Sequence, residues 1–254
     1  MIDTLPRISH NLRNSIRDLH RSSFREERQE FLAEGPHVLD EILRAGIRPG
    51  VVIVRDDASF EIQDLVERCV HDNIPVFASG AKDMELMSDA SAPQAVLCAA
   101  PYRTEDAIGE RVLVLDAVSD PGNVGTMIRC AAWFGFTDVV LGVGCADLYN
   151  PKTIRSTVGA AFHINVLRKR ELSSWLQHIS DRPHFAAVAR GGESPDRLVN
   201  ESTFALVIGS EAHGISADVE ASCTARLSIP GSGGSESLNA AMAAAILCYE
   251  GRKR

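Results

Sequence analysis

The sequence predicts an α/β fold in which helices cover both faces of a largely parallel sheet. Short apolar runs of strand type alternate with helical patterns along almost the whole chain, and several of these runs are apolar at every position. Strands that are apolar on both faces are typical of a parallel sheet buried between two layers of helices. With 254 residues, 45% of them hydrophobic and 24% charged, the chain is long enough for one large or two modest domains.

The first hundred residues contain elements of both kinds. Apolar side chains recur at helical spacing over residues 36–45 and again over 61–71. The expected strands are 51–54, 74–77 and 95–98. Pro75 has no backbone N–H, so we expect it at the start of a strand or in an edge strand.

A polar, turn-rich stretch separates two parts of the chain. Residues 101–110 begin with Pro-Tyr-Arg-Thr-Glu-Asp directly after a finished strand run. Such stretches are typical of domain boundaries. We therefore expect one domain at residues 1–104 and a second at 105–254.

The second part is more regular. Its expected strands are 112–115, 138–141, 164–167, 185–189, 204–208 and 226–229, and its expected helices are about 123–135, 171–178 and 238–250. Ligand sites in parallel sheets lie beyond the carboxyl ends of the strands. The loops that follow Leu115, Ala189, Ile208 and Ile229 are therefore the places where we expect the chemistry.

Composition argues against several classes of protein. The six cysteines are scattered without a C-x-x-C pair, and the eight histidines show no H-E-x-x-H spacing, which argues against a disulfide framework and a metal site. No apolar run approaches the ~20 residues of a membrane span, and the first residues lack a secretory signal. We expect a cytoplasmic protein without a metal. The net charge of −8 is unusual for an RNA-binding protein, but a basic face can lie on an acidic body.

The loop after residues 112–115 combines a turn with a helix start. Asp120-Pro121-Gly122 is a turn sequence, Asn123 is expected to cap the helix, and Arg129 follows within two turns. Free N–H groups at a helix start favour an anion such as a phosphate. The alternative is a plain strand–turn–helix with an exposed arginine.

Two later loops are rich in glycine. In the first, Gly209 and Gly214 flank Glu211 just past a buried strand, where glycine lets a ligand approach the backbone. The second, at 229–239, leads into a final helix whose start, 240–245, has mostly small side chains. The alternatives are a solvated loop and a flexible connection to an ordinary core helix.

In this order, the three loops resemble the signature motifs of the SpoU (TrmH-type) RNA 2′-O-ribose methyltransferases, a branch of the SPOUT superfamily. The residues that carry the resemblance are Asp120-Pro121-Gly122-Asn123-Val124-Gly125 with Arg129, then Ile208-Gly209-Ser210-Glu211 with Gly214, then Ile229-Pro230 and Ser237-Leu238-Asn239. Residues 150–160 also resemble a family segment, with Thr157 where serine is common. Gly231 stands where the family often has a bulkier apolar residue.

The first domain resembles the small ribosomal-protein-like α/β substrate-binding domain of many SpoU enzymes. Its clearest mark is Phe31-Leu32-Ala33-Glu34-Gly35-Pro36. The resemblance implies that the second domain is a SPOUT α/β-knot, a parallel sheet with helices on both faces and a deep trefoil knot. It also implies a homodimer with the active site at or near the interface.

The activity implied is methyl transfer from S-adenosylmethionine to a ribose 2′-hydroxyl of structured RNA, with ribosomal RNA favoured over transfer RNA. The resemblance assigns cofactor contacts to Gly191, Gly209, Ile229 and Leu238. It makes Arg129 the central catalytic residue, with Asn123, Glu211, Ser237 and Asn239 orienting it and the cofactor. Arginine is effectively always protonated, so we expect Arg129 to hold a phosphate and to stabilise negative charge rather than to act as a base.

RNA contacts are expected from a set of arginines. Arg13, Arg17, Arg21 and Arg25 recur every four residues and would form one basic stripe on a helix. The alternative is a solvated helix face. Arg155 and Lys152 are further candidates near the site.

Three other functions stay open at this stage. The first two are a transfer-RNA methyltransferase and a non-catalytic RNA-binding relative of the same fold. The third is an α/β oxidoreductase, because Gly142 and Gly144 resemble half of a dinucleotide-binding glycine motif. The intact motif residues argue against the non-catalytic relative, and the lack of a complete G-x-G-x-x-G argues against the oxidoreductase.

Overall fold

The computed structural model describes residues 2–234 and 236–252, and it divides the chain into two compact units. The first comprises Met1–Thr104 and Tyr149–Phe162, and the second comprises Glu105–Leu148 and His163–Arg254. Its position along the chain places 149–162 within the predicted second domain. By its contacts the segment packs with the first unit instead.

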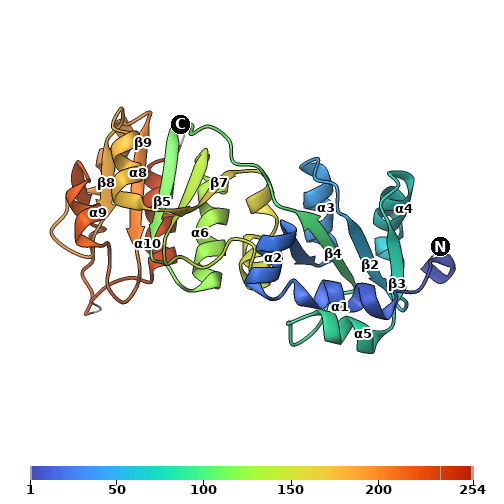
Figure 1. Cartoon of the computed structure of the whole chain (residues 1–254). Coiled ribbons are helices and arrows are strands. Elements are labelled where there is room, and N and C mark those ends of the chain that lie inside the picture. Colours follow the sequence, from blue (N-terminus) through green and yellow to red (C-terminus); the bar gives the residue numbers. More distant parts are fainter. Residues whose placement is uncertain (1, 235, 253–254) are drawn as a thin grey trace. The chain divides into compact units, whose positions relative to one another are not determined.

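The first unit is a sheet between two layers of helices (Figure 1). Its elements are η1 (Ile2–Thr4), α1 (His10–Asp18), α2 (Ser22–Arg28), β1 (Glu30–Glu34), α3 (Pro36–Arg44), β2 (Val51–Arg55), η2 (Phe60–Ile62), α4 (Gln63–His71), β3 (Val76–Ser79), α5 (Ala81–Met87), β4 (Val96–Pro101), α7 (Pro151–Thr157) and η3 (Ala160–Phe162). The strand order is β1-β4-β2-β3. β4 runs antiparallel to β1 and β2, whereas β2 and β3 are parallel.

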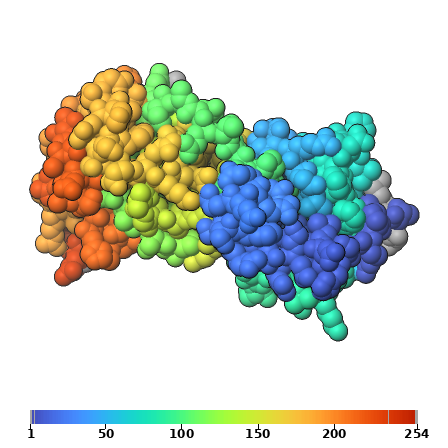
Figure 2. Space-filling view, in the orientation of Figure 1, coloured from blue at the N-terminus to red at the C-terminus, as the bar shows by residue number. Residues whose placement is uncertain are grey.

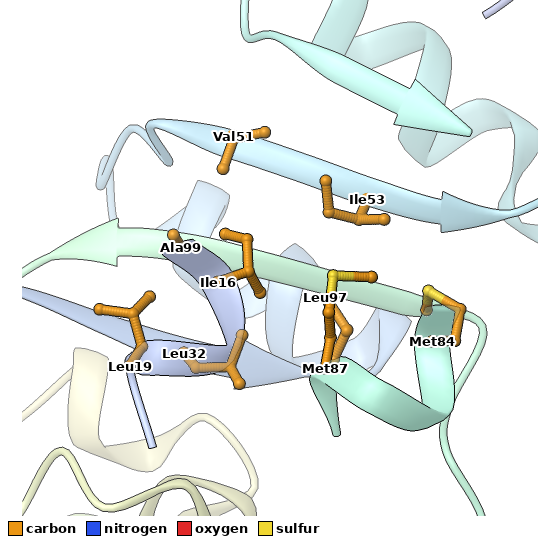
Figure 3. Close-up of a cluster of buried hydrophobic side chains, with 9 residues drawn as sticks. All are labelled: Ile16, Leu19, Leu32, Val51, Ile53, Met84, Met87, Leu97 and Ala99. Carbon is orange, nitrogen blue, oxygen red and sulfur yellow. The ribbon is translucent and has the colours of Figure 1, made fainter. Parts of the chain in front are cut away.

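The core of this unit lies against one face of the sheet. Figure 3 shows Ile16 of α1, Leu19 directly after it, and Met84 and Met87 of α5 packed on side chains from β1, β2 and β4. Alternation along a strand sends the intervening residues, such as Val52, to the other face, where α3 and α4 lie. Pro75 precedes β3, an edge strand, as the missing N–H requires.

The second unit is a six-stranded sheet in which every pairing is parallel. Its elements are β5 (Arg111–Asp116), α6 (Pro121–Trp133), β6 (Asp138–Gly142), β7 (Asn165–Arg170), α8 (Leu172–His178), β8 (His184–Ala187), η4 (Pro195–Asn200), β9 (Phe204–Gly209), α9 (Ala217–Ala221), β10 (Ala225–Leu227) and α10 (Ala240–Glu250). The strand order is β10-β8-β9-β5-β6-β7. The predicted α/β class and parallel sheet are confirmed.

Two pairs of helices cover the sheet of the second unit. α8 and α9 pack over one face, where Leu172, Leu176 and Val219 join the valines of β5, β6 and β9. α6 and α10 pack against each other, and α10 also contacts β9. On the face drawn in Figure 2, both early residues of this unit (green) and late residues (orange) are at the surface. Within the described ranges, no helix has the length and hydropathy needed to cross a bilayer.

Candidate active site

The first motif loop leads from β5 into α6 and is fixed by a helix cap. Asp120 has an extended backbone, and its carboxylate accepts the N–H of Asn123 at 2.9 Å. Pro121 occupies the first turn, where a missing N–H costs nothing. The expectation that Asn123 caps this helix is wrong, because Asp120 satisfies the free N–H. The side-chain amide of Asn123 is therefore available for another partner.

That partner is Glu211. The Nδ2 of Asn123 donates a hydrogen bond to the Oε1 of Glu211, which follows β9. The two residues are 88 positions apart in sequence. The parallel pairing of β5 and β9 brings the loops that follow them to the same edge of the sheet. The structure thus joins the first and second motifs through two predicted site residues.

The second motif loop turns back on itself immediately after β9. Ser210 and Gly214 exchange two backbone hydrogen bonds, of 3.1 and 2.9 Å. A Cβ on Gly209 would lie 2.1 Å from the carbonyl carbon of Gly214, so only glycine fits there. Gly214 has a φ of +69°, which also favours glycine. These contacts hold Glu211 at the tip of a compact turn.

Asp116 is a residue of this site that the sequence analysis did not single out. It ends β5 opposite Gly209, is buried, and its Oδ2 accepts the N–H of Ser216 at 2.7 Å. The carboxylate therefore ties the far end of the second motif loop to the strand that carries the first motif. An acid directly after an apolar strand run was the available signal.

Arg129 lies on α6 and projects into solvent. It makes no hydrogen bond or ion pair with the residues that the structure describes. Over six positions of an α-helix the side-chain direction rotates by about 240° around the axis. The side chains of Asn123 and Arg129 therefore lie on different sides of α6. The structure does not bring Arg129 together with Asn123 or Glu211.

The third motif loop ends at α10, and its last residue caps that helix. The side chain of Asn239 accepts the N–H groups of Ala241 and Met242 at 2.9 and 3.3 Å. Ser237 and Leu238 are exposed, and Ile229 is half-buried. Because α10 packs on α6, the end of this loop leads to the helix that carries Arg129.

The segment after β8 lies beside the start of the third motif loop. The N–H of Gly192 donates to the Oγ of Ser228 at 3.2 Å, and Glu193 pairs with Leu227. A Cβ on Gly192 would lie 2.5 Å from the carbonyl carbon of Leu227. The close backbone approach in this segment is at Gly192, whereas a Cβ on Gly191, for which a cofactor contact is predicted, would meet no atom within 4 Å.

Gly191 lines an open pocket of about 690 Å³ at the edge of the sheet. The other lining residues are Gly192, Glu193, Ala217, Glu220, Ala221, Cys223, Thr224, Ala225 and Arg226. Gly209, Ile229 and Leu238 do not line this pocket. Gly191, Gly209 and Ile229 lie at or just beyond the ends of the neighbouring strands β8, β9 and β10, whereas Leu238 lies just before α10.

The four regularly spaced arginines do not form one basic stripe, so that prediction is wrong. α1 ends at Asp18 and α2 begins at Ser22, which interrupts the helical spacing. Arg25 is 2% exposed and donates to the carbonyls of Leu19 and His20, so its guanidinium joins the two helices.

The other N-terminal arginines differ in their accessibility. Arg13 pairs with Asp83, and Arg21 is exposed but pairs with Asp18. The side chain of Arg17 is exposed and has no described partner. Arg17 and Arg21 are therefore the two exposed members of the predicted stripe.

Arg155 is held inside the first unit. Its guanidinium pairs with Glu34 at 3.3 Å and with Asp89 at 2.5 Å. The side chain of Glu34 is only 3% exposed, and it also accepts the Ser88 hydroxyl and the N–H of Gln94. Arg155 neutralises a buried carboxylate. This is a structural role, whereas the sequence predicts an RNA contact.

Family models match both parts of the chain. A model described as the SpoU rRNA Methylase family matches residues 110–249, and an MRM3-like substrate binding domain matches residues 14–98. The chain is 34% identical to the 23S rRNA (guanosine(2553)-2′-O)-methyltransferase RlmP of Bacillus subtilis, over 91% of this chain and 92% of that protein. The chain belongs to the SpoU rRNA methylase family. The resemblance on which the sequence analysis relied is confirmed.

Solved structures agree with this SpoU family assignment. A TrmH-family protein from Porphyromonas gingivalis is 33% identical and matches with a TM-score of 0.84, over 96% of this chain and 98% of that one. An AdoMet-bound rRNA methyltransferase from Sinorhizobium meliloti, 23% identical, has the same fold, with a TM-score of 0.84 over 97% of this chain and 96% of that one. Among the described residues of this SpoU methylase, no three His, Cys, Asp or Glu side chains gather as metal ligands.

We expect Asp116→Ala to lower kcat for methyl transfer about tenfold. The Ser216 N–H loses its acceptor, so the loop that presents Glu211 to Asn123 is no longer tied to β5. A lost hydrogen bond to a charged group costs about 1.5–3 kcal/mol. Steady-state kinetics and thermal unfolding measure the effect. Asp116→Asn keeps an acceptor oxygen and should retain most activity; equal losses in both variants would contradict the proposed tie.

We expect Arg155→Ala to lower the free energy of unfolding by about 2–3 kcal/mol. The substitution leaves the buried Glu34 carboxylate without its cation, and breaking a buried pair in this way is strongly destabilising. Urea unfolding of the full chain measures the change. Arg17→Ala is the matched control, because it removes an exposed arginine without a described partner. Equal stability of both variants would refute the role of Arg155.

Proposed function

We propose that this protein transfers a methyl group from S-adenosylmethionine to a ribose 2′-hydroxyl of 23S ribosomal RNA. As a member of the SpoU rRNA methylase family, the chain is an RNA methyltransferase. The observation that carries the reaction to particular residues is the hydrogen bond between Asn123 and Glu211. It joins two family motifs at neighbouring strand ends, where ligand sites of parallel sheets lie.

The residues at these strand ends suit an elongated cofactor held by the backbone. A Cβ added at Gly191, Gly214 or Gly231 would meet no atom within 4 Å, so a ligand can approach the main chain there. In our proposal, S-adenosylmethionine contacts Gly191, Gly209, Ile229 and Leu238. It supplies a methyl group already activated as part of a sulfonium. Relatives that share the fold include the AdoMet-bound Sinorhizobium meliloti protein, which supports this cofactor.

The residues of the chain then have two tasks in our proposal. The first is to hold the ribose in line with the methyl group, since positioning of this kind is worth about 7–11 kcal/mol. The Asn123–Glu211 pair and the capped start of α10 at Asn239 give rigid points for it. The second is to stabilise charge on the hydroxyl oxygen as its proton leaves. We assign this to Arg129, whose exposed guanidinium is available to an RNA phosphate.

Ribosomal RNA is the favoured substrate because of the relatives that match nearly the whole chain. The Bacillus subtilis relative acts on guanosine 2553 of 23S rRNA, and rRNA methyltransferase 3 of mouse mitochondria is 27% identical over 91% of this chain. The MRM3-like substrate binding domain supports the same class of RNA. We propose Arg17 and Arg21 as phosphate contacts of that domain. Bacterial 23S rRNA is made in the cytoplasm, which is the location that we propose.

We also propose that the C-terminal part of the chain forms a trefoil knot. Residues 226–228 lie between β8 on one side and Gly192–Glu193 on the other. This short strand is thus flanked on both sides by chain that precedes it. Such an arrangement is what threading through a loop produces.

An exposed apolar face on α10 supports a homodimer. Met242, Ile246 and Tyr249 are 63%, 40% and 48% exposed and recur at helical spacing. Trp133 of the neighbouring α6 is 83% exposed. α10 is apolar on all sides, which is typical of a helix buried all round. Arg129 lies one turn before Trp133, so the proposed interface adjoins the proposed catalytic arginine.

We expect Met242→Glu combined with Ile246→Glu to convert the dimer into monomers. Two carboxylates on this face would have to be buried without partners, which is costly. Light scattering coupled to size-exclusion chromatography measures the mass. Replacement of the exposed Leu86 of the first unit by glutamate is the control. A double variant that keeps the parent's dimer mass would rule out this interface.

The central experiment is a methyl-transfer assay with the full chain. An in vitro transcript of 23S rRNA that contains nucleotide 2553 is incubated with radiolabelled S-adenosylmethionine, and the modified nucleotide is mapped. We expect one 2′-O-methylated ribose. A transfer-RNA transcript is the comparison. Methylation of the transfer RNA alone, or a base methyl group instead of a ribose methyl group, would overturn the proposal.

A further inference from the structure

A second pocket lies at the carboxyl ends of β6 and β7, within the second unit. Its volume is about 290 Å³. It is lined by Leu141, Gly142, Val143, Gly144, Cys145, Ala146, Asp147, Leu148, Arg168 and Lys169. It contains the glycine fragment that the sequence analysis considered as a dinucleotide loop. No helix follows the fragment directly, so the pocket needs another explanation.

The position of the pocket relates it to the active site. The strand order β9-β5-β6-β7 places four strand ends side by side at one edge of the sheet (Figure 1). The first two carry the Glu211 loop and the Asn123 loop, and the last two carry the pocket. The pocket loop also contacts the first motif loop directly, because the N–H of Ala146 donates to Val118 at 2.9 Å. The pocket therefore adjoins the loops at which we propose that the ribose is methylated.

The walls of the pocket offer both charge and apolar surface. Arg168 and Lys169 are the cationic side chains that line it and Asp147 is the acidic one, while Glu105 accepts the N–H of Arg168 beside it. Val143 is 62% exposed at its mouth, and Leu148 is buried. A phosphate prefers guanidinium and ammonium groups, and a base stacks on or packs against apolar groups. The volume suits one base better than a whole dinucleotide.

The backbone on both sides of the pocket is unusual. Lys169 has a φ of +55°, at a point where the pairing of β6 and β7 shifts register. Such bulges redirect side chains and recur next to active sites. Opposite, a Cβ on Gly142 would lie 2.6 Å from the Leu172 side chain and 3.0 Å from the Leu115 carbonyl oxygen. The bulge and the glycine together shape a hollow at the end of the two strands.

Cys145 is a structural part of the wall. Its thiol donates to the carbonyl of Leu115 at 3.1 Å, and burial raises the pKa of this thiol to about 11. The side chain therefore stays protonated at neutral pH and anchors the pocket loop to β5.

We propose that this pocket binds the nucleotide next to the methylated one, with its phosphate on Arg168 and Lys169 and its base against Val143 and Leu148. The inference rests on the proposed RNA methyl transfer. It adds a determinant of substrate choice within the methyltransferase unit, separate from the N-terminal substrate-binding domain.

The test compares the loss of cations inside and outside the pocket in the full-length protein. The pocket variant is Arg168→Ala with Lys169→Gly, because glycine tolerates the positive φ at 169. The matched control is Arg197→Ala, which removes a cation of the second unit that pairs with Glu201 and does not line the pocket. Both are assayed for methyl transfer to the 23S rRNA transcript over a range of salt concentrations.

We expect the pocket variant to raise KM for the transcript about tenfold or more, with kcat at saturating RNA within about twofold of the parent. The dependence of log KM on log salt should become shallower by about one to two, since each lost phosphate contact reduces the slope by about one. Affinity for S-adenosylhomocysteine, measured by calorimetry, should not change. The Arg197→Ala control should keep the parent's KM and salt slope.

Val143→Glu tests the pocket by adding a charge, without removing an existing contact. Val143→Glu places a carboxylate at the exposed mouth of the pocket, and we expect it to raise KM for the transcript as well. If the Arg168→Ala, Lys169→Gly variant has a lower melting temperature than the parent, the KM of Val143→Glu tests the subsite instead. If the parent methylates the transcript and both pocket variants keep the parent's KM and salt slope, the subsite is rejected and the proposed function stands. A parent that methylates no ribose of the transcript overturns the proposed function and the subsite with it.

Discussion

Replacing Arg129 with alanine is expected to lower kcat for methyl transfer by about 10²–10³-fold while S-adenosylmethionine binding survives. Loss of one group that stabilises developing negative charge has effects of this size. Arg129 is exposed and has no described partner in the protein, so its removal leaves no buried group unsatisfied. The melting temperature should therefore stay close to that of the parent. Single-turnover kinetics measure the rate, and isothermal titration measures the cofactor.

Two variants sharpen this test. Arg129→Lys keeps the charge but loses the planar, bidentate geometry that suits a phosphate, so we expect only partial recovery. Thr126→Ala changes an exposed residue of the same helix one turn earlier and should be nearly silent. Near-normal turnover of the alanine variant would remove Arg129 from the mechanism. A parallel loss of cofactor affinity would move its role from the ribose to the cofactor.

Truncation to residues 105–254 is expected to give a protein that aggregates when expressed alone. The segment Tyr149–Phe162 connects β6 to β7 of the second unit but packs in the first. There the Tyr149 ring stacks on Phe31, with centroids 4.9 Å apart, and Phe162 stacks on the same ring at 5.8 Å. Burying each large apolar side chain contributes about 1.5–3 kcal/mol. That is a large share of a total stability of about 5–15 kcal/mol.

The measurement is the soluble fraction of the fragment and its thermal unfolding by circular dichroism. A second fragment carries a glycine–serine linker in place of 149–162, and we expect this replacement to restore solubility. A soluble, cooperatively folding fragment with the natural segment would refute the argument. Insolubility of both fragments would assign the defect to other surfaces of the second unit.

Much of the fold was predictable because its signals are local. The strands of the second unit are apolar on both faces, so their positions follow from the sequence to within a few residues. Pro75 marked an edge strand for a simple reason, its missing N–H. β1 was not predicted as a strand, although its burial is nearly continuous, because its residues were interpreted only as part of a family motif.

Regular spacing of charges proved a poor guide to surface. Arg13, Arg17, Arg21 and Arg25 keep a four-residue interval, but the chain turns between α1 and α2. Spacing does not reveal where a helix ends, and it does not show that a guanidinium such as that of Arg25 satisfies buried carbonyls. Arg155 illustrates the same point, since its partner Glu34 lies 121 residues away.

The sequence by itself determined the α/β class, the order of most elements and the three motif loops, because each of these depends on periodicity or residue type over a short stretch. Only the tertiary structure decided which of the motif residues meet. Asn123 meets Glu211, Asp116 holds Ser216, and Asp120 rather than Asn123 caps α6. The contacts of Asn123 with Glu211 and of Asp116 with Ser216 depend on the parallel pairing of β5 and β9, which lie far apart in the chain. No local pattern encodes that pairing, so the geometry of the site had to come from the packed fold.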